Sequence, residues 1–261
     1  MTGIDWTERA SRSEIEYSKA RGGVTVDYPE FTHIHNRFVP LAGDYNRAVR
    51  VRLGDFDSFD RVVRTLRQVH REHRLDPPDR LDVLPPSLDE VAWNEYLTPR
   101  GGRARTVLFF TAAALPGPMP EGFKFYVPSE KEYSRWYRRR VEASDWFDEE
   151  WFAAAMPLQL GFIRVFKPYW LLEDGQRVGW VYCANLGDYC RLFEVEIEEN
   201  RRGSGLGTLL MQAARIEAEK LGASHVLLQA DERLRAFYEQ AGFTECTRNS
   251  VIRLGLPEGS H

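Results

Sequence analysis

The chain has 261 residues, of which 43% are hydrophobic, so it is long enough for one large domain or two small ones. Its formal net charge of -4 does not favour a nucleic-acid-binding protein, and we expect no nucleic-acid partner. The three cysteines have neither metal-site nor disulfide-framework spacing, and no apolar run could span a membrane. We therefore expect a cytoplasmic protein without membrane contact.

Strands and helices alternate in the N-terminal half. Residues 1–22 predict a polar lead-in that is partly helical, and residues 22–41 predict extended chain. The apolar spacing then predicts a strand within 45–55, a helix over 58–75 with Ser58 or Asp57 as its N-cap, a breaker region over 76–87, a short helix over 88–97 and a strand over 103–114. The segment 115–122 holds three prolines and two glycines and is the best linker candidate.

The C-terminal half continues the alternation. Ser129 is the expected N-cap of a helix, and 148–161 is a second helical segment. Three extended runs within 161–199 are separated by Asp-Gly and Leu-Gly-Asp turns and predict a meander. The remaining expected elements are a glycine-rich turn with its helix, a strand over 224–231, a helix over 232–242 and a terminal hairpin over 243–255.

The glycine-rich turn, RRGSGLGTLL, is the strongest chemical signal. Gly203, Gly205 and Gly207 stand between a strand and an amphipathic helix, whose first backbone N–H groups lack internal partners. Backbone without Cβ atoms can approach an anion closely, and Arg201 and Arg202 add positive charge. The turn lacks the Gly-Lys-Ser/Thr ending of a P-loop and the G-x-G-x-x-G spacing of a dinucleotide site, so a turn without any ligand is the alternative.

Two segments resemble one family. The turn resembles the R/Q-x-x-G-x-G/A signature of the GNAT acyltransferases, with Arg202, Gly205 and Gly207 at the signature positions. DERLRAFYEQAGF resembles the later family segment N-x-x-A-x-x-L-Y-x-x-x-G-F, although Asp231 and Leu234 depart from it. The order and separation of both motifs also agree with the family, and the resemblance covers residues 122–257.

The resemblance implies a site for acetyl-CoA and no metal. Its pyrophosphate would lie on the turn and its pantetheine arm along the preceding strand, which assigns cofactor binding to Val195, Ile197, Arg201, Arg202, Gly203, Ser204, Gly205, Leu206, Gly207, Thr208 and Asp231. Tyr238 falls on the tyrosine of the family that would protonate the leaving thiolate, or it is a core aromatic residue. Glu194 and Glu196 would deprotonate or attract an amine, or they form a solvated strand face.

The implied fold is α/β (α+β): a mixed, mostly antiparallel twisted sheet flanked by helices, as in the GNAT fold. The expected divisions are a lead-in over 1–22, a degenerate GNAT-like half over 23–120 and an acetyl-CoA-binding domain over 121–261. For the first half, an unrelated α/β cap is the alternative, because the assignment depends on element order alone.

The implied activity is acetyl transfer from acetyl-CoA to a primary amine by direct attack in a ternary complex. A silent acyl-CoA-binding or regulatory protein, an interaction module without CoA, and transfer of another acyl group are the alternatives. The acceptor is a small molecule or a peptide or protein, and the chain is a monomer or homodimer. Acidic residues near the site would favour cationic acceptors, whereas the charge run RWYRRR over 135–140 is a solvated helix face or contacts an acidic acceptor.

Two weaker patterns are open to a structural explanation. His33 and His35 share one strand face, but no third metal ligand is apparent in the sequence, so we expect no metal there. Four aromatic residues in the second expected helix of the C-terminal half and in the loop before it belong to the core or line an acceptor pocket: Trp146, Phe147, Trp151 and Phe152.

Overall fold

The computed structural model describes residues 4–36, 46–75, 77–78, 80–83, 89–144 and 147–255. The chain forms two compact units, and each takes residues from separate parts of the sequence. The first unit comprises 1–109, 230–234 and 245–261, and the second comprises 110–229 and 235–244. The two later segments, 230–234 and 245–261, belong to the first unit although they follow most of the second in the sequence.

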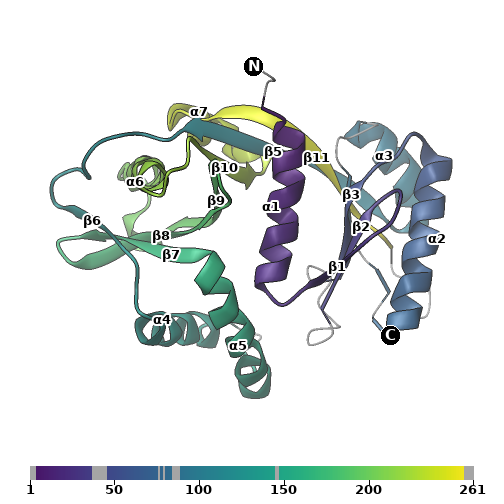
Figure 1. Ribbon diagram of the computed structural model, residues 1–261, viewed down its shortest axis with the longest axis horizontal. Helices are drawn as coiled ribbons and strands as arrows, with labels where there is room; N and C mark the ends of the chain where they lie inside the picture. Colours follow the sequence, from purple (N-terminus) through teal and green to yellow (C-terminus); the bar gives the residue numbers. More distant parts are fainter. Residues whose placement is uncertain are drawn as a thin grey trace. The chain divides into compact units, whose positions relative to one another are not determined.

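The first unit contains three α-helices and the sheet order β1-β2-β3-β4-β11-β5 in its described part (Figure 1). The helices are α1 (Trp6–Ala20), α2 (Phe56–His73) and α3 (Glu90–Leu97), followed by the short helix η1 (Thr98–Arg100). The strands are β1 (Val24–Asp27), β2 (Thr32–His35), β3 (Arg47–Val51), β4 (Arg80–Val83), β5 (Arg103–Ala113) and β11 (Thr244–Arg253). The β3–β4 pair is parallel, whereas β1–β2, β2–β3 and β4–β11 are antiparallel.

The partly helical lead-in is confirmed, since α1 occupies Trp6–Ala20 and its N-cap Asp5 accepts a hydrogen bond from the Glu8 amide. Three other predictions for this unit need correction. The N-cap of α2 is Asp55, because Ser58 is the third helical residue of a capping box with it. The breaker region contains the short strand β4, and the prolines of this region precede or follow the strand in the sequence. The expected terminal hairpin is one strand, β11, which pairs with β4.

The second unit has the sheet order β5-β10-β9-β8-β7-β6, with β5 contributing residues to both units. Its strands are β6 (Phe123–Tyr126), β7 (Lys167–Glu173), β8 (Gln176–Asn185), β9 (Tyr189–Ile197) and β10 (His225–Ala230). Its helices are α4 (Glu130–Glu142), α5 (Glu149–Val165), η2 (Glu199–Arg201), α6 (Leu206–Lys220) and α7 (Arg235–Gln240). The predicted meander is confirmed, since β7, β8 and β9 pair antiparallel in sequence order. The predicted cap of α4 is also confirmed, because Ser129 and Glu132 form a capping box.

Helices cover both faces of the second sheet, with α4 and α5 on one side and α6 on the other (Figure 1). The Tyr133 hydroxyl of α4 lies 2.8 Å from the Tyr182 hydroxyl of β8. On the opposite face, the Tyr169 hydroxyl of β7 donates to Glu217 of α6. Successive strand residues point to opposite faces, so the side chain of a β8 or β9 residue meets either the α4 face or the α6 face.

Candidate active site

The glycine turn joins the end of β9 to the start of α6. Gly203 and Gly205 both have φ of 79°, the left-handed region that favours glycine, and Gly205 is the N-cap of α6. A Cβ atom on either residue would meet nothing within 4 Å, so the turn faces open space. At Gly207, by contrast, a Cβ atom would lie 3.0 Å from the Phe237 ring, so this glycine permits close packing against α7.

The turn has the properties of an anion site. The first amide groups of α6 lack intrahelical acceptors, and the helix dipole gives this end partial positive charge. Arg202 lies at the turn, where its Nε donates to the Ile197 carbonyl at 3.3 Å. Arg201 forms an ion pair with Glu173 of β7. The turn can therefore present backbone donors and Arg202 to a phosphate group.

Strand β9 separates from its parallel neighbour just before this turn. The β9–β10 pairing runs only from Tyr189 with His225 to Arg191 with Leu227, although both strands continue. The register of β9 against β8 shifts between Phe193 and Glu196, and Glu194 has φ of 47°. This bulge reorients the backbone of β9 beyond its pairing with β10. The separated segment contains both predicted pantetheine-binding positions, Val195 and Ile197.

Tyr238 is the buried aromatic residue of α7. Its ring stacks on Phe110 with centroids 5.6 Å apart and meets Phe237 and Phe243 edge-on. Burial raises the pKa of Tyr238 to about 12, although the positive charge of Arg191 acts in the opposite direction. The hydroxyl is therefore protonated at neutral pH and can act as a donor. The packing is also what a core aromatic residue shows, so structure alone supports both roles.

The carboxylates of β9 have different surroundings. Glu194 is exposed, and its negative charge contributes to raising the pKa of Tyr182, for which burial is the main cause. Glu196 accepts a hydrogen bond from Arg140 of α4 at 2.7 Å. Burial acts against the charged form of Arg140, but its hydrogen bond to Glu196 and the charges of Glu196 and Glu194 raise its pKa, so both carboxylates stabilise this guanidinium.

A cavity of about 520 Å³ opens on the α4 face of the sheet, and we call it the α4–β9 cavity. Its walls come from α4, β8, the end of β9 and the start of the turn. The side chains that form most of it are Trp136, Arg139, Arg140, Arg177, Trp180 and Glu196. Glu198, Glu199 and Arg202 complete the charged part of the lining, so the cavity reaches the glycine turn.

Sequence reasoning missed part of this cavity. Residues of the RWYRRR run supply Trp136, Arg139 and Arg140, and helical spacing was the signal that placed them on one element. Arg177 and Trp180 had no such signal, because their position depends on the pairing of β8 with β9. Of the aromatic residues considered for an acceptor pocket, Phe152 is buried, Trp151 is 40% exposed, and Trp146 lies outside the described residues.

Asp231 belongs to a different part of the molecule. It lies in a short segment of the first unit, where it forms ion pairs with Arg105 at 3.2 Å and Arg233 at 3.5 Å. Its predicted role in cofactor binding stays a prediction. Among the described residues, no group of three or more histidine, cysteine or acidic side chains is arranged to hold a metal ion. Within the same residues, no helix is long and apolar enough to cross a membrane.

Comparison with known families identifies this region. The model of the acetyltransferase (GNAT) family matches residues 131–243, which run from α4 to the end of the α7 segment. Residues 131–243 are a GNAT acetyltransferase domain. The resemblance seen in the two sequence motifs is thereby confirmed. No curated protein matches the chain significantly.

Solved structures share the fold over most of the chain. A GCN5-related N-acetyltransferase from Kribbella flavida has a TM-score of 0.67 at 14% identity, covering 100% of this chain and 99% of its own. A functionally unknown conserved protein from Staphylococcus epidermidis also has a TM-score of 0.67, at 12% identity and with 90% and 95% coverage. A tandem GNAT protein from the clavulanic acid biosynthesis pathway has a TM-score of 0.51 at 15% identity, covering 87% of this chain and 79% of its own. At these identities the similarity shows the fold alone.

Proposed function

We propose that the GNAT domain binds acetyl-CoA and transfers its acetyl group to an amine. The observation that carries this proposal is the position of the glycine turn. Only the short helix η2 separates the turn from a strand whose end pairs with β8 but no longer with β10, so a backbone cradle for phosphate lies near a free edge of β9. An acyl thioester that carries a pyrophosphate group needs a phosphate site and, next to it, strand backbone that can pair with the arm between pyrophosphate and thioester.

The residues fit such a ligand. The amide groups between Gly203 and Thr208 would bind the pyrophosphate together with Arg202, while the backbone of Val195 and Ile197 would pair with the pantetheine arm. Bound acetyl-CoA supplies the thioester carbonyl that the amine attacks. Transfer to the amine forms an amide bond and breaks the carbon–sulfur bond, and it leaves CoA as a thiol once a proton reaches the sulfur.

The reaction needs a proton donor for the leaving thiolate and a proton acceptor for the amine. Tyr238 would donate to the leaving thiolate, because it occupies the tyrosine position of the second family motif. Glu194 or Glu196 would accept a proton from the amine directly or through water, and Arg140 donates a hydrogen bond to Glu196. Transfer of a different acyl group would use the same residues.

Calorimetric titration with acetyl-CoA tests the binding step. We expect Gly205→Glu to weaken binding at least about a hundredfold, or about 2.7 kcal/mol, because a carboxylate would project over the phosphate cradle. Gly222→Glu is the matched control. Gly222 follows α6, has φ of 81° and likewise has open space around it, so it carries the same strain and charge at the other end of the helix.

The two variants separate strain from ligand contact. Equal loss of binding in both would attribute the effect to the helix fold, and an unchanged affinity in Gly205→Glu would reject the cradle. If the folded parent protein does not bind acetyl-CoA, the proposed function is wrong. Binding without acetyl transfer to any amine would leave an acyl-CoA-binding protein without catalytic activity.

A further inference from the structure

The α4–β9 cavity has a charge arrangement that bears on the acceptor. Four arginines and three glutamates line it. A charged side chain of either sign can bind a ligand fully only if it is not already in an ion pair with an oppositely charged side chain of the lining. A carboxylate that is paired by a guanidinium attracts a cation less than a free one, because the attraction is shared. The pairing inside the cavity therefore decides which charge an acceptor would meet.

The two glutamates deepest in the strand region are paired. Glu196 receives Arg140 Nη2 at 2.7 Å on one oxygen and lies 3.8 Å from Arg202 Nη2 through the other. Glu198 receives both Nε and Nη2 of Arg177, at 2.9 Å and 2.8 Å. Only Glu199, which is exposed on η2 at the rim, has no ion pair among the described residues.

The arginines of the cavity keep N–H donors that no carboxylate uses, and two of these arginines stack on tryptophan rings. Each guanidinium group has five N–H donors, and Arg140 uses one nitrogen for Glu196. The guanidinium of Arg140 lies 4.6 Å from the Trp180 ring centroid. That of Arg177 lies 5.1 Å from the Trp136 centroid. Stacked guanidinium groups are held in place, so less side-chain freedom is lost when they bind an anion.

Arg139 adds a cation without a carboxylate partner. Its Nε donates to the Arg135 carbonyl of its own helix, and in the described residues no acidic side chain lies within 4 Å of it. Its neighbour Arg138 differs, because Glu142 and Glu149 both hold it and it does not line the cavity. Arg139 and the remaining donors of Arg140 therefore form one cationic wall on α4.

We infer that the acceptor carries a carboxylate in addition to its amine, and that Arg139 and Arg140 bind this carboxylate in the α4–β9 cavity. The inference rests on the proposed function, since it concerns the second substrate of that reaction. It reverses the expectation that acidic residues near the site favour a cationic acceptor, because Arg140 pairs with Glu196 and Arg177 pairs with Glu198. The amine would then lie toward β9, and the carboxylate toward α4.

Matched pairs of amines test the inference. Each pair differs only in the carboxylate: lysine and cadaverine, 4-aminobutyrate and butylamine, and a short peptide with a free or an amidated C-terminus. Acetyl transfer is followed by the release of CoA thiol. We expect kcat/KM to favour the carboxylate-bearing member at least about tenfold, and Arg139→Glu to remove about that factor by raising KM.

Arg138→Glu is the control, because it places the same charge one residue away but outside the cavity. It should leave the preference within about twofold, whereas an equal loss in both variants would attribute the effect to the overall charge of α4 and reject the inference. A preference for the amines without a carboxylate also overturns it. So does the absence of reaction with every carboxylate-bearing amine when the same sample binds acetyl-CoA. Failure to bind acetyl-CoA is distinct, since it removes the proposed function and the inference together.

Discussion

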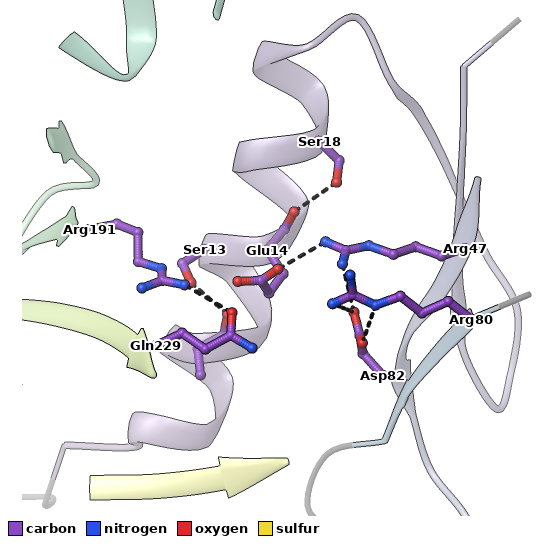
Figure 2. A network of polar contacts seen from close by, with 9 residues as sticks. Ser13, Glu14, Ser18, Arg47, Arg80, Asp82, Arg191 and Gln229 are labelled. Carbon is purple, nitrogen blue, oxygen red and sulfur yellow. Dashed lines mark hydrogen bonds and ion pairs between the residues drawn. The ribbon is translucent and has the colours of Figure 1, made fainter. Parts of the chain in front are cut away.

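The two units use their charged residues differently. In the GNAT domain the arginines and glutamates lie partly exposed around a cavity; Arg140 and Glu196, for example, have 39% and 32% exposed side chains. In the first unit Arg47 joins Glu14 and Asp82 at 2.9 Å and 3.0 Å, and these three side chains are at most 4% exposed (Figure 2). Charges at a cavity remain accessible to a ligand, whereas charges buried with one another contribute to the structure.

The first unit also packs histidine side chains against one another. His33 and His35 of β2 meet His70 and His73 of α2, with His33 Nε2 and His70 Nε2 3.1 Å apart. The rings of His33 and His35 stack at 5.1 Å, and those of His35 and His73 at 4.9 Å. Burial lowers the pKa of His33 to about 3, and the other three imidazoles act in the same direction. The His33 ring is thus packed as a neutral group at neutral pH.

The buried ion pairs give the largest expected effect. Arg47→Met removes the guanidinium that two buried carboxylates share, and we expect the free energy of unfolding to fall by about 3–5 kcal/mol. Arg138→Met, which breaks exposed pairs in the GNAT domain, should change it by about 0–1 kcal/mol. Denaturant titration measures both. If both variants lost a similar free energy of unfolding, the charged residues of the two units would not differ in their contribution to stability.

Removing the hydroxyl of Tyr238 tests the catalytic role in the GNAT domain. We expect Tyr238→Phe to lower kcat about a hundredfold with little change in acetyl-CoA affinity, because the leaving thiolate loses its proton donor. Steady-state kinetics and calorimetry together measure this. Tyr169→Phe is the control: it removes a buried hydroxyl bonded to Glu217 and should change kcat little. An unchanged kcat in Tyr238→Phe would leave Tyr238 as a core residue.

The histidine cluster gives the smallest effect, in its response to pH. His33 has a folded-state pKa of about 3 and an ordinary value of 6.5, so between these values the unfolded chain binds more protons. Stability should therefore fall as the pH drops below 6.5, by roughly 1 kcal/mol in the first pH unit. The comparison is the slope against pH in parent and His33→Leu. A slope that is unchanged in His33→Leu would contradict the assignment.

The limits of sequence reasoning follow from the range of the interactions involved. Ser129 and Glu132 are three residues apart, so their capping box is visible in the sequence. The cap of α2 was misplaced by a few residues, because Asp55, Asp57 and Ser58 are all good N-cap residues and backbone geometry selects one. Strand β4 was missed between prolines, since its stability comes from pairing with β3 and β11.

The sequence by itself determined the glycine turn and the family of the domain, because the glycines, the arginines and the start of α6 are adjacent in the chain. Tertiary structure alone decided the partners of the charged and titratable groups. Arg140 and Glu196 are 56 residues apart, and His33 and His70 are 37 apart. Whether a carboxylate is available, or a histidine neutral, depends on which distant side chain packs against it, and the order of residues along the chain does not specify that contact.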